Sequence, residues 1–405
     1  MKTWKLTKLI ALLLTLVMIT QVSPFTGWAE EQTIDPPEET TPEILSEIES
    51  LRDKNIKHFR LSDGTYIAAQ YTYPVHYRKN GSWEDIDNRL VTDASGAITN
   101  EASDVDIAFG IRASDDGMVR VSHGGYEVSM GMKSVSAVNA QVNNDVHAGA
   151  PEDSMSEAMP ENLFSSVTYK NIQPKIDLSY VVSPTGVKES IVLYQKQEQY
   201  VYRFPLNTDG LTATLQEDKS VDLRDDLGNV IFSITAPFMV DDDGARSNDI
   251  EVSLTQDDDG YILTLTPDAA WINDTDRVFP VVVDPSLEVG EYAIESQVYG
   301  ASSPDQTYND QNLYVGHTGD VMRTYLGFDM PNLPANVSIT GATLRMTQVY
   351  GYNNSYGNYD PININVYEAP DEWTDEGKTW NNQPNCLQDT ATSLDLEVID
   401  YQPVI

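Results

Sequence analysis

The chain has 405 residues, with 63 acidic side chains against 25 basic ones, a formal net charge of −38 and a single cysteine. A surface this acidic repels nucleic-acid phosphates, so nucleic-acid binding is not expected, and one cysteine excludes an intramolecular disulfide. It also repels anionic cell-wall polymers, so binding to a wall or a glycan would need stacking, hydrogen bonds or bridging divalent cations.

The N-terminus has the pattern of a secretory signal peptide, residues 1–29. Three lysines within the first eight residues precede an apolar run from Leu9 to Ile19, and small residues end at Ala29. The run is short for a bilayer span, so we expect a secreted, extracellular protein with no membrane span after signal removal. The alternative, an uncleaved N-terminal anchor, remains open.

Residues 30–56 read as an acidic leader followed by a short helix. The leader, "EEQTIDPPEETTPE", is rich in proline and charge, which is typical of disorder. Thr40 and Glu43 have the spacing of a capping box, and Pro42 suits a first helical turn. The apolar residues that follow share one helical face: Ile44, Leu45, Ile48 and Leu51.

From residue 57 to residue 289 the pattern changes to short alternating runs separated by Asp-Gly and Asn-Gly turns, which are hairpin signals. In "KIDLSYVV", for example, Ile176, Leu178, Tyr180 and Val182 share a face. Strands recurring with almost no helical period predict an all-β protein of antiparallel β-sandwich regions with the one short N-terminal helix.

Residues 134–162 interrupt the strand pattern. The stretch is small, polar and rich in Met and Ala. We interpret it as a long flexible insertion, with a weak helix as the alternative. A second strand-rich unit, residues 290–405, follows the Asp-Pro stop after "RVFPVVV".

The second unit resembles the DNRLRE-type jelly-roll domain, which is related to carbohydrate-binding module family 96. The motifs that carry the resemblance are "YNDQNLYVG", "RTYLGFDMPNLPANVSITGATLRM" and "WTDEGKTWNNQP". They place the family pattern at Leu313, Val315, Gly316, Arg323, Phe328, Asp329, Leu333, Pro334, Ala342, Thr343, Leu344, Arg345, Trp373, Thr379, Trp380, Asn381 and Pro384. In that family the tryptophan segment is a recurrent corner, so Trp380 is expected to be a structural anchor.

The upstream unit resembles the N-terminal region of secreted, wall-associated RHS/YD-repeat proteins of Firmicutes, through "KHFRLSDGTYIAAQYTYPVHYRKNGSWEDIDNRL", "VKESIVL" and "VFPVVVDP". In those proteins a DNRLRE-like domain, YD repeats and a variable toxin follow. Here the turn at Tyr308-Asn309-Asp310 lacks the usual glycine, and the family would supply further strands after "LDLEVIDYQPVI". Because these further strands are absent, the resemblance implies a C-terminally truncated jelly roll. Such an unfinished sheet would leave unpaired strand edges. It also implies that the C-terminal repeats of a longer protein are missing.

The sequence shows none of the usual catalytic motifs. It has no Gly-x-Ser-x-Gly, no His-Glu-x-x-His and no phosphate-binding glycine loop, and its five histidines show no ligand spacing. Carboxylates are so abundant that any two could be named as a glycosidase pair, so abundance is no signal. We expect no catalytic residues and no enzyme activity; a polysaccharide-active enzyme is the less favoured alternative.

No cofactor is certain, and calcium is the best candidate because hard oxygen ligands abound. "DDDG" at 241–244 and at 257–260 is more simply explained by hairpin turns. Asp305, Asp310 and Asp329 of the jelly roll are the candidate calcium ligands.

The candidate carbohydrate-binding residues are aromatic. The loop "YGYNNSYGNYD" mixes flat apolar faces with amide and hydroxyl groups, as binding loops do. The residues concerned are Tyr350, Tyr352, Tyr356, Tyr359 and Trp373.

Two hypotheses for the function follow. One is a non-catalytic, wall-associated surface protein whose jelly roll binds a cell-wall or extracellular glycan. The other is a purely structural scaffold that presents or encapsulates downstream repeats or a toxin.

Overall fold

The computed structural model describes residues 42–94, 96–146, 158, 160–257, 260–289, 295–299, 313, 315–317, 321–327, 336–344, 346, 362–369, 379–386 and 390–396. The regular secondary structure of these residues is almost entirely β-strand with antiparallel pairing, as predicted. Within them the only α-helix is the single turn α1 (Ala269–Ile272), which is capped by the Asp268 carboxylate. No helix in this part of the chain combines the length and the apolar character that a bilayer crossing requires.

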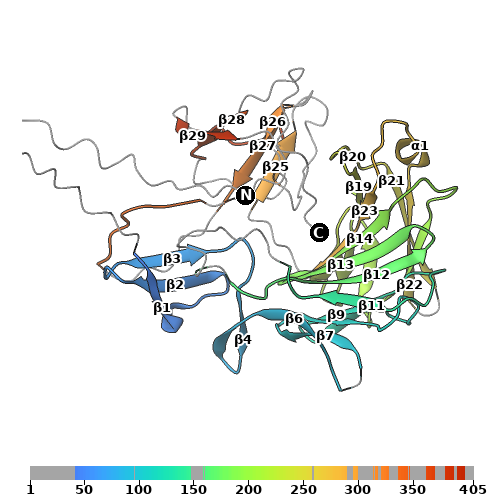
Figure 1. Cartoon of the computed structure of the whole chain (residues 1–405), viewed down its shortest axis with the longest axis horizontal. Helices are drawn as coiled ribbons and strands as arrows, with labels where there is room; N and C mark the ends of the chain where they lie inside the picture. The colour runs from blue at the N-terminus through green and yellow to red at the C-terminus, as the bar shows by residue number, and fades with distance from the viewer. Residues whose placement is uncertain are drawn as a thin grey trace, which may run out of the picture.

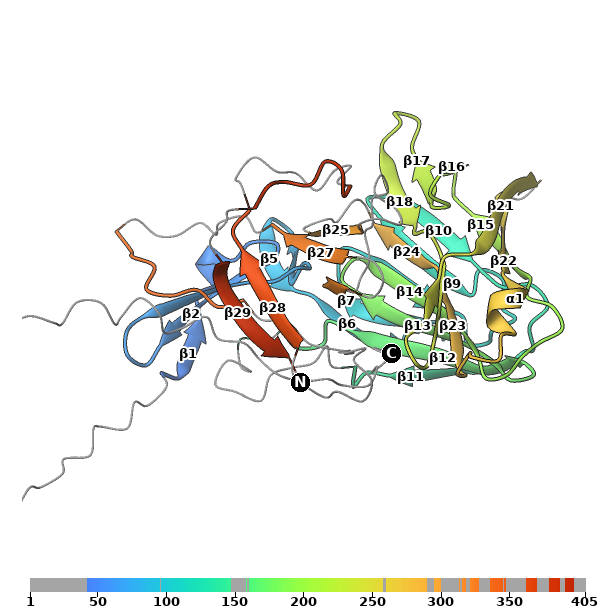
Figure 2. The same cartoon turned by 90° about the horizontal axis from the view of Figure 1, so that it is seen from above.

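A small three-stranded sheet forms the N-terminal part and lies beside the larger sheets (Figures 1 and 2). It contains β1 (Ile44–Glu47), β2 (Ile56–Leu61) and β3 (Tyr66–Gln70). A separate hairpin, β4 (His76–Lys79) and β5 (Ser82–Asp85), follows it. The hairpin turn is Asn80-Gly81, and both residues have positive φ, 52° and 88°, as a type I′ turn requires.

The helix predicted to begin near Ile44 is mostly wrong. Ile44–Glu47 form β1, and only Glu49–Leu51 form a single 3-10 turn, η1. The physical reason is pairing with a neighbour: β1 lies antiparallel to β2, with Glu47 opposite Phe59. Backbone hydrogen bonds to an adjacent strand thus outweigh a local helical pattern.

Two large sheets make up most of the described chain. The first has eight strands in the order β21-β22-β15-β10-β9-β8-β7-β6. Its strands are β6 (Asp87–Thr92), β7 (Ile98–Ala102), β8 (Asp106–Phe109), β9 (Val119–His123), β10 (Tyr126–Met130), β15 (Tyr202–Asn207), β21 (Ile250–Asp257) and β22 (Gly260–Pro267).

The second large sheet has eleven strands, with the main order β11-β12-β13-β14-β24-β18-β17-β16 and a branch in which β23 pairs with β14 and β19, and β19 with β20. Its strands are β11 (Ala140–Asn143), β12 (Ser165–Gln173), β13 (Ile176–Ser183), β14 (Gly186–Leu193), β16 (Thr212–Leu215), β17 (Val221–Arg224), β18 (Val230–Ile234), β19 (Phe238–Asp241), β20 (Arg246–Ser247), β23 (Val281–Asp284) and β24 (Ser286–Val289).

One hydrophobic core joins the two large sheets, so they form a sandwich. The face predicted from "KIDLSYVV" is confirmed: Ile176, Leu178, Tyr180 and Val182 are each at most 2% exposed. Across the sandwich the rings of Phe109 and Tyr180 lie 5.5 Å apart, centroid to centroid. Burying each such side chain contributes about 1.5–3 kcal/mol to folding.

The segment expected as a flexible insertion, 134–162, contributes one strand to the second large sheet. Residues 140–143 form β11, which pairs with β12, and Val135 and Val138 pack against the core. The prediction is corrected for this part. An edge strand that exposes most of its side chains needs few apolar residues, so its composition resembles that of a loop. Residues 147–157 and 159 lie outside the described residues.

The C-terminal unit shows two further antiparallel sheets among its described residues. One contains β25 (Glu295–Tyr299), β26 (Gly316–His317) and β27 (Val321–Leu326), with β27 in the centre. The other pairs β28 (Ile362–Tyr367) with β29 (Thr390–Leu396).

A corner at residues 379–386 packs on β27 and contains Trp380. The Arg323 guanidinium carbon lies 4.7 Å from the centre of the Trp380 ring. Gln383 connects the two segments: its amide nitrogen donates to the Trp380 carbonyl at 2.7 Å, and its side-chain oxygen accepts from Arg323 at 2.7 Å and from the Tyr325 hydroxyl at 2.9 Å. Trp380 is half-buried, in agreement with its expected role as a corner anchor.

A carboxyl group is buried inside the sandwich. Glu189 on β14 is 1% exposed and lies opposite Tyr180 on β13. With Tyr180 and mostly apolar residues it lines a cavity of about 10 Å³, enough for about one water molecule. Burial raises the pKa of Glu189 to about 8; the Tyr180 hydroxyl opposes the shift and the Asp284 charge adds to it. Glu189 is therefore protonated in the folded protein at neutral pH.

The first prediction concerns Glu189. Its folded pKa lies above its unfolded value of 4.5, so the unfolded state releases its proton first, and stability falls as pH rises from 4.5 to about 8. Glu189→Gln should raise the free energy of unfolding at pH 7 by about 3 kcal/mol, with the gain vanishing below pH 4.5. Urea unfolding across this pH range measures it. Glu127→Gln, at an exposed glutamate on β10, is the control, and equal pH profiles for all three proteins would refute the burial argument.

The second prediction concerns the corner. Gln383→Ala should lower the stability of the C-terminal unit by about 2 kcal/mol, because it removes the two hydrogen bonds that join the corner to β27 and a third within the corner. Thermal unfolding followed by tryptophan fluorescence measures the loss. The neighbouring exposed Asn385→Ala should have no effect, and a Gln383→Ala variant that melts with it would contradict the role of Gln383.

Candidate functional site

The predicted binding residues of the C-terminal unit lie outside the described residues. These are the candidate carbohydrate-binding residues Tyr350, Tyr352, Tyr356, Tyr359 and Trp373, and the candidate calcium ligands Asp305, Asp310 and Asp329. In the same unit, the structure describes the corner at residues 379–386, which packs on β27 through Trp380 and Gln383.

The "DDDG" segment at 241–244 is a hairpin turn between β19 and β20, as the sequence predicted. The Gly244 amide donates to the Asp241 carbonyl at 2.9 Å. The Asp241 side chain is 2% exposed and accepts from the Ala245 amide at 2.8 Å and from Arg277 at 2.9 Å. This carboxylate is used within the fold.

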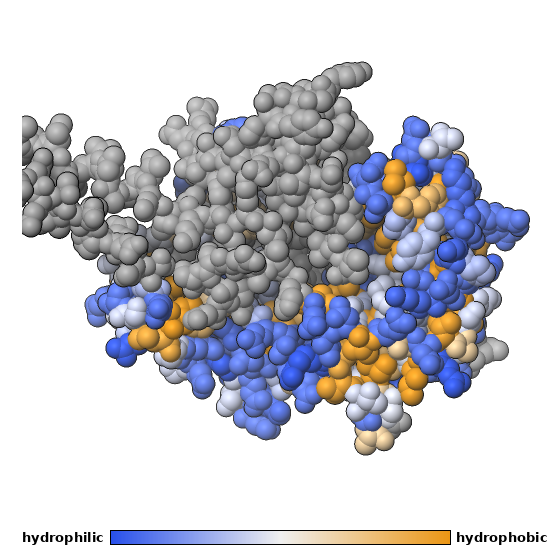
Figure 3. Space-filling view, in the orientation of Figure 1, coloured by the Kyte–Doolittle hydropathy of each residue, from blue (hydrophilic) through white to orange (hydrophobic). Residues whose placement is uncertain are grey.

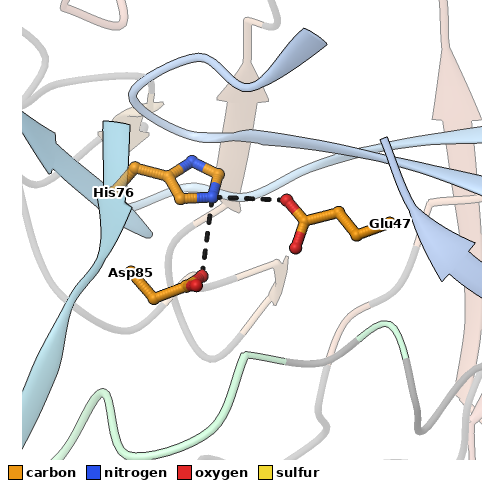
Figure 4. Close-up of side chains that lie close together, drawn as sticks. All are labelled: Glu47, His76 and Asp85. Carbon is orange, nitrogen blue, oxygen red and sulfur yellow. Dashed lines mark ion pairs between the residues drawn. The ribbon is translucent and has the colours of Figure 1, made fainter. Parts of the chain in front are cut away.

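A polar cluster in the N-terminal part was missed by the sequence analysis. It consists of Glu47, Arg52, Lys57, His76 and Asp85, and we call it the His76 cluster. Among the described residues, Glu47, His76 and Asp85 are the one set of three carboxylate or imidazole groups whose ligand atoms all lie within 4.8 Å of one another. The cluster joins the first sheet to the β4–β5 hairpin (Figure 4).

Strand pairing places these side chains together. In the β4–β5 hairpin His76 lies directly opposite Asp85, two pairs beyond the pair formed by Arg78 and Trp83. Glu47 is the last residue of β1, and Lys57 is on the neighbouring strand β2. The Asn80-Gly81 turn fixes the hairpin register, so the His76–Asp85 pair follows from the turn.

Two basic residues neutralise the two carboxylates. Arg52 binds Glu47 through both oxygens, at 2.7 and 2.9 Å, and reaches Asp85 at 2.9 Å. Lys57 forms an ion pair with Asp85 and lies 3.5 Å from the second oxygen of Glu47. Burial alone would raise the pKa of Glu47, but the neighbouring His76, the hydrogen bonds from Arg52 and the charge of Lys57 lower it well below its usual range.

His76 is the buried centre of the cluster. It is 1% exposed, and its Nδ1 lies 2.6 Å from the carbonyl oxygen of Asp53. Because a carbonyl oxygen only accepts, Nδ1 must carry the hydrogen. Nε2 then faces Glu47 Oε1 and Asp85 Oδ1, at 3.6 Å from each. Within the described structure this nitrogen is buried and has no hydrogen-bond partner.

The arrangement allows two kinds of chemistry at Nε2. A neutral imidazole directs a lone pair at two negative oxygens, which is unfavourable unless a positive charge lies between them. That charge is either a proton on Nε2 or a cation held by all three groups.

Comparison with known proteins gives the C-terminal unit a family. Residues 292–402 match the model of carbohydrate-binding module family 96. The tRNA3(Ser)-specific nuclease WapA of Bacillus spizizenii is 29% identical over 366 residues, which cover 84% of this chain and 15% of that protein. The tRNA nuclease WapA of Bacillus subtilis is 27% identical over 365 residues, with the same shares. The chain thus spans about 15% of the length of these relatives.

A third relative is named for the cell wall. The Wall-associated protein of Geobacillus stearothermophilus is 27% identical over 203 residues, which cover 49% of this chain and 74% of that protein. No solved structure matches the chain. The expected DNRLRE-like jelly roll is confirmed at the level of family: the chain carries a domain of carbohydrate-binding module family 96 at residues 292–402, within a sequence related to wall-associated proteins.

Proposed function

We propose that this chain is a secreted, non-catalytic, wall-associated protein that attaches to a cell-wall or extracellular glycan through residues 292–402. The observation that carries the proposal is the match of these residues to a carbohydrate-binding module family. The relative named Wall-associated protein supports the location. The signal peptide at residues 1–29 would supply the route of export.

Charge limits the kind of contact that this attachment can use. With a net charge of −38, the chain is repelled by anionic wall polymers. The described face in Figure 3 is mostly hydrophilic, with apolar residues in separate patches. Binding must therefore come from a local site with stacking and hydrogen bonds, which the tyrosine loop 350–360 and Trp373 would provide. Calcium at Asp305, Asp310 and Asp329 would be a bridging alternative.

The nuclease names of two relatives do not transfer to this chain in our proposal. The shared region is only 15% of each of those proteins, and a catalytic unit needs only a part of the remainder. The acidic surface of this chain also disfavours a polyanionic substrate such as tRNA. We propose that residues 57–289 and the module are the attachment part of an RHS-like protein.

A structural scaffold is the second candidate. The observation that favours it is that this chain matches only 15% of the length of the nuclease relative from Bacillus spizizenii. In that case the sandwich and the module only present or encapsulate downstream repeats or a toxin.

The third prediction tests attachment. The purified chain should sediment with isolated bacterial walls, and Tyr352→Ala with Tyr356→Ala should weaken retention about tenfold, the equivalent of about 1.4 kcal/mol of lost stacking. Tyr66→Ala is the matched control, because Tyr66 is 60% exposed on β3, outside the module. Retention that persists in EDTA would exclude a calcium bridge.

Two outcomes would count against the attachment proposal. Unchanged retention of the double variant would remove the tyrosine loop as the site. No retention on walls or soluble glycans, with or without divalent cations, would leave the scaffold as the remaining function.

The fourth prediction separates this chain from its nuclease relatives. Incubated with total tRNA and Mg²⁺, the purified chain should leave the tRNA intact on a denaturing gel, because no catalytic constellation is expected in it. Cleavage that co-purifies with the chain through successive chromatographic steps would show that this region has activity of its own.

A further inference from the structure

The His76 cluster has the geometry of a first coordination shell. The Nε2 atom of His76 is 3.6 Å from one oxygen of Glu47 and 3.6 Å from one oxygen of Asp85. Zinc bonds to nitrogen and oxygen of about 2.0–2.2 Å, at tetrahedral angles, separate neighbouring ligand atoms by about 3.3–3.6 Å. The two nitrogen–oxygen distances therefore fit a shared ion, and the two carboxylates, whose ligand atoms lie within 4.8 Å of each other, would move closer together around it.

The histidine is already oriented as a metal ligand. The Asp53 carbonyl, 2.6 Å from Nδ1, fixes the tautomer that leaves Nε2 as the donor of an electron pair. Metal-binding histidines generally use such a carbonyl or a carboxylate on the opposite ring nitrogen. The ring is 1% exposed, so it keeps this orientation without solvent competing for Nε2.

We propose that Glu47, His76 and Asp85 bind one zinc ion, with His76 coordinating through Nε2 and each carboxylate through one oxygen. The imidazole favours zinc over calcium and magnesium, which take oxygen ligands. Three protein ligands leave a fourth position for water. This proposal is independent of glycan binding, since the cluster lies outside the module.

Lys57 is the competitor for this position. Its ammonium pairs with the same Asp85 oxygen that faces His76, so it acts as a fixed cation in part of the space that the ion would use. Asp85 has a side chain 50% exposed, which gives the ion a way in and the lysine a way out. Arg52 keeps its two bonds to Glu47 and holds that carboxylate in place, since each oxygen has a second lone pair for the metal.

An ion-pair network alone explains the cluster less completely. Arg52 and Lys57 satisfy Glu47 and Asp85, yet the His76 Nε2 lone pair still faces two carboxylates without a hydrogen-bond partner among the described residues. A proton on Nε2 or a metal cation at this point would each remove the conflict between the nitrogen and both oxygens, and the titration described next distinguishes the two.

Calorimetric titration of the purified chain with zinc chloride tests the proposal. We expect saturable binding of one ion at this site, weakened at least about tenfold in both His76→Ala and Asp85→Asn. His123→Ala is the matched control: its Nδ1 also lies near a backbone carbonyl, Asp104 at 2.9 Å, but among the described residues it belongs to no set of three potential metal ligands. Zinc affinity should be the same in this variant as in the unaltered chain.

Lys57→Met distinguishes a zinc site from a purely structural network. Methionine keeps the buried stem and removes the competing charge, so zinc should bind about tenfold more tightly, and zinc should raise the melting temperature of this variant more than that of the unaltered chain. Asp85 is half exposed, so Asp85→Asn should fold even if His76→Ala does not. Equal zinc affinity in the unaltered chain, Asp85→Asn and Lys57→Met, or no saturable binding by the unaltered chain, would overturn the proposal.

Discussion

The apolar contact between the two large sheets is the constraint on which the rest of the described structure depends. β13 and β14 lie in the middle of the eleven-stranded sheet, and their inward side chains face β8 and β9 of the other sheet. Tyr169 adds a directional element, because its hydroxyl donates to the Gly110 carbonyl across the interface at 2.6 Å. A sheet that is buried on one face must keep its register, since a slip of one residue would expose every core side chain.

Within this core Glu189 is a deliberate exception to the apolar pattern. It lies opposite Tyr180, among mostly apolar neighbours. The fold tolerates it by keeping the group protonated, which avoids the cost of burying a charge. The His76 cluster solves the opposite problem: there Glu47 stays ionised because Arg52 and Lys57 lie beside it. The same residue type thus has two protonation states, set by its neighbours.

The strands were predictable because a strand buried on one face alternates apolar and polar residues along the sequence. The face of Ile176 and Tyr180, and the turn at Asn80-Gly81, follow from such local signals. β1 was not predictable from local sequence. Its strand conformation depends on pairing with β2, and this tertiary contact overrides the local helical pattern. The His76 cluster falls between these cases. The hairpin register gives His76 opposite Asp85, but Glu47 joins them only once β1 is known to be a strand. The tyrosine loop and the three aspartates remain predictions, because they lie outside the described residues.

Net charge and short-range binding are compatible in this protein because they act over different distances. Repulsion between the acidic surface and an anionic wall is screened beyond about 8 Å at physiological ionic strength. Stacking and hydrogen bonds act only at contact, where screening hardly weakens them. A module that holds a neutral sugar face therefore needs no favourable long-range field. The same reasoning applies to the proposed zinc site of the His76 cluster: the ion would bind through contacts with two carboxylates and a buried imidazole, in competition with the Lys57 ammonium.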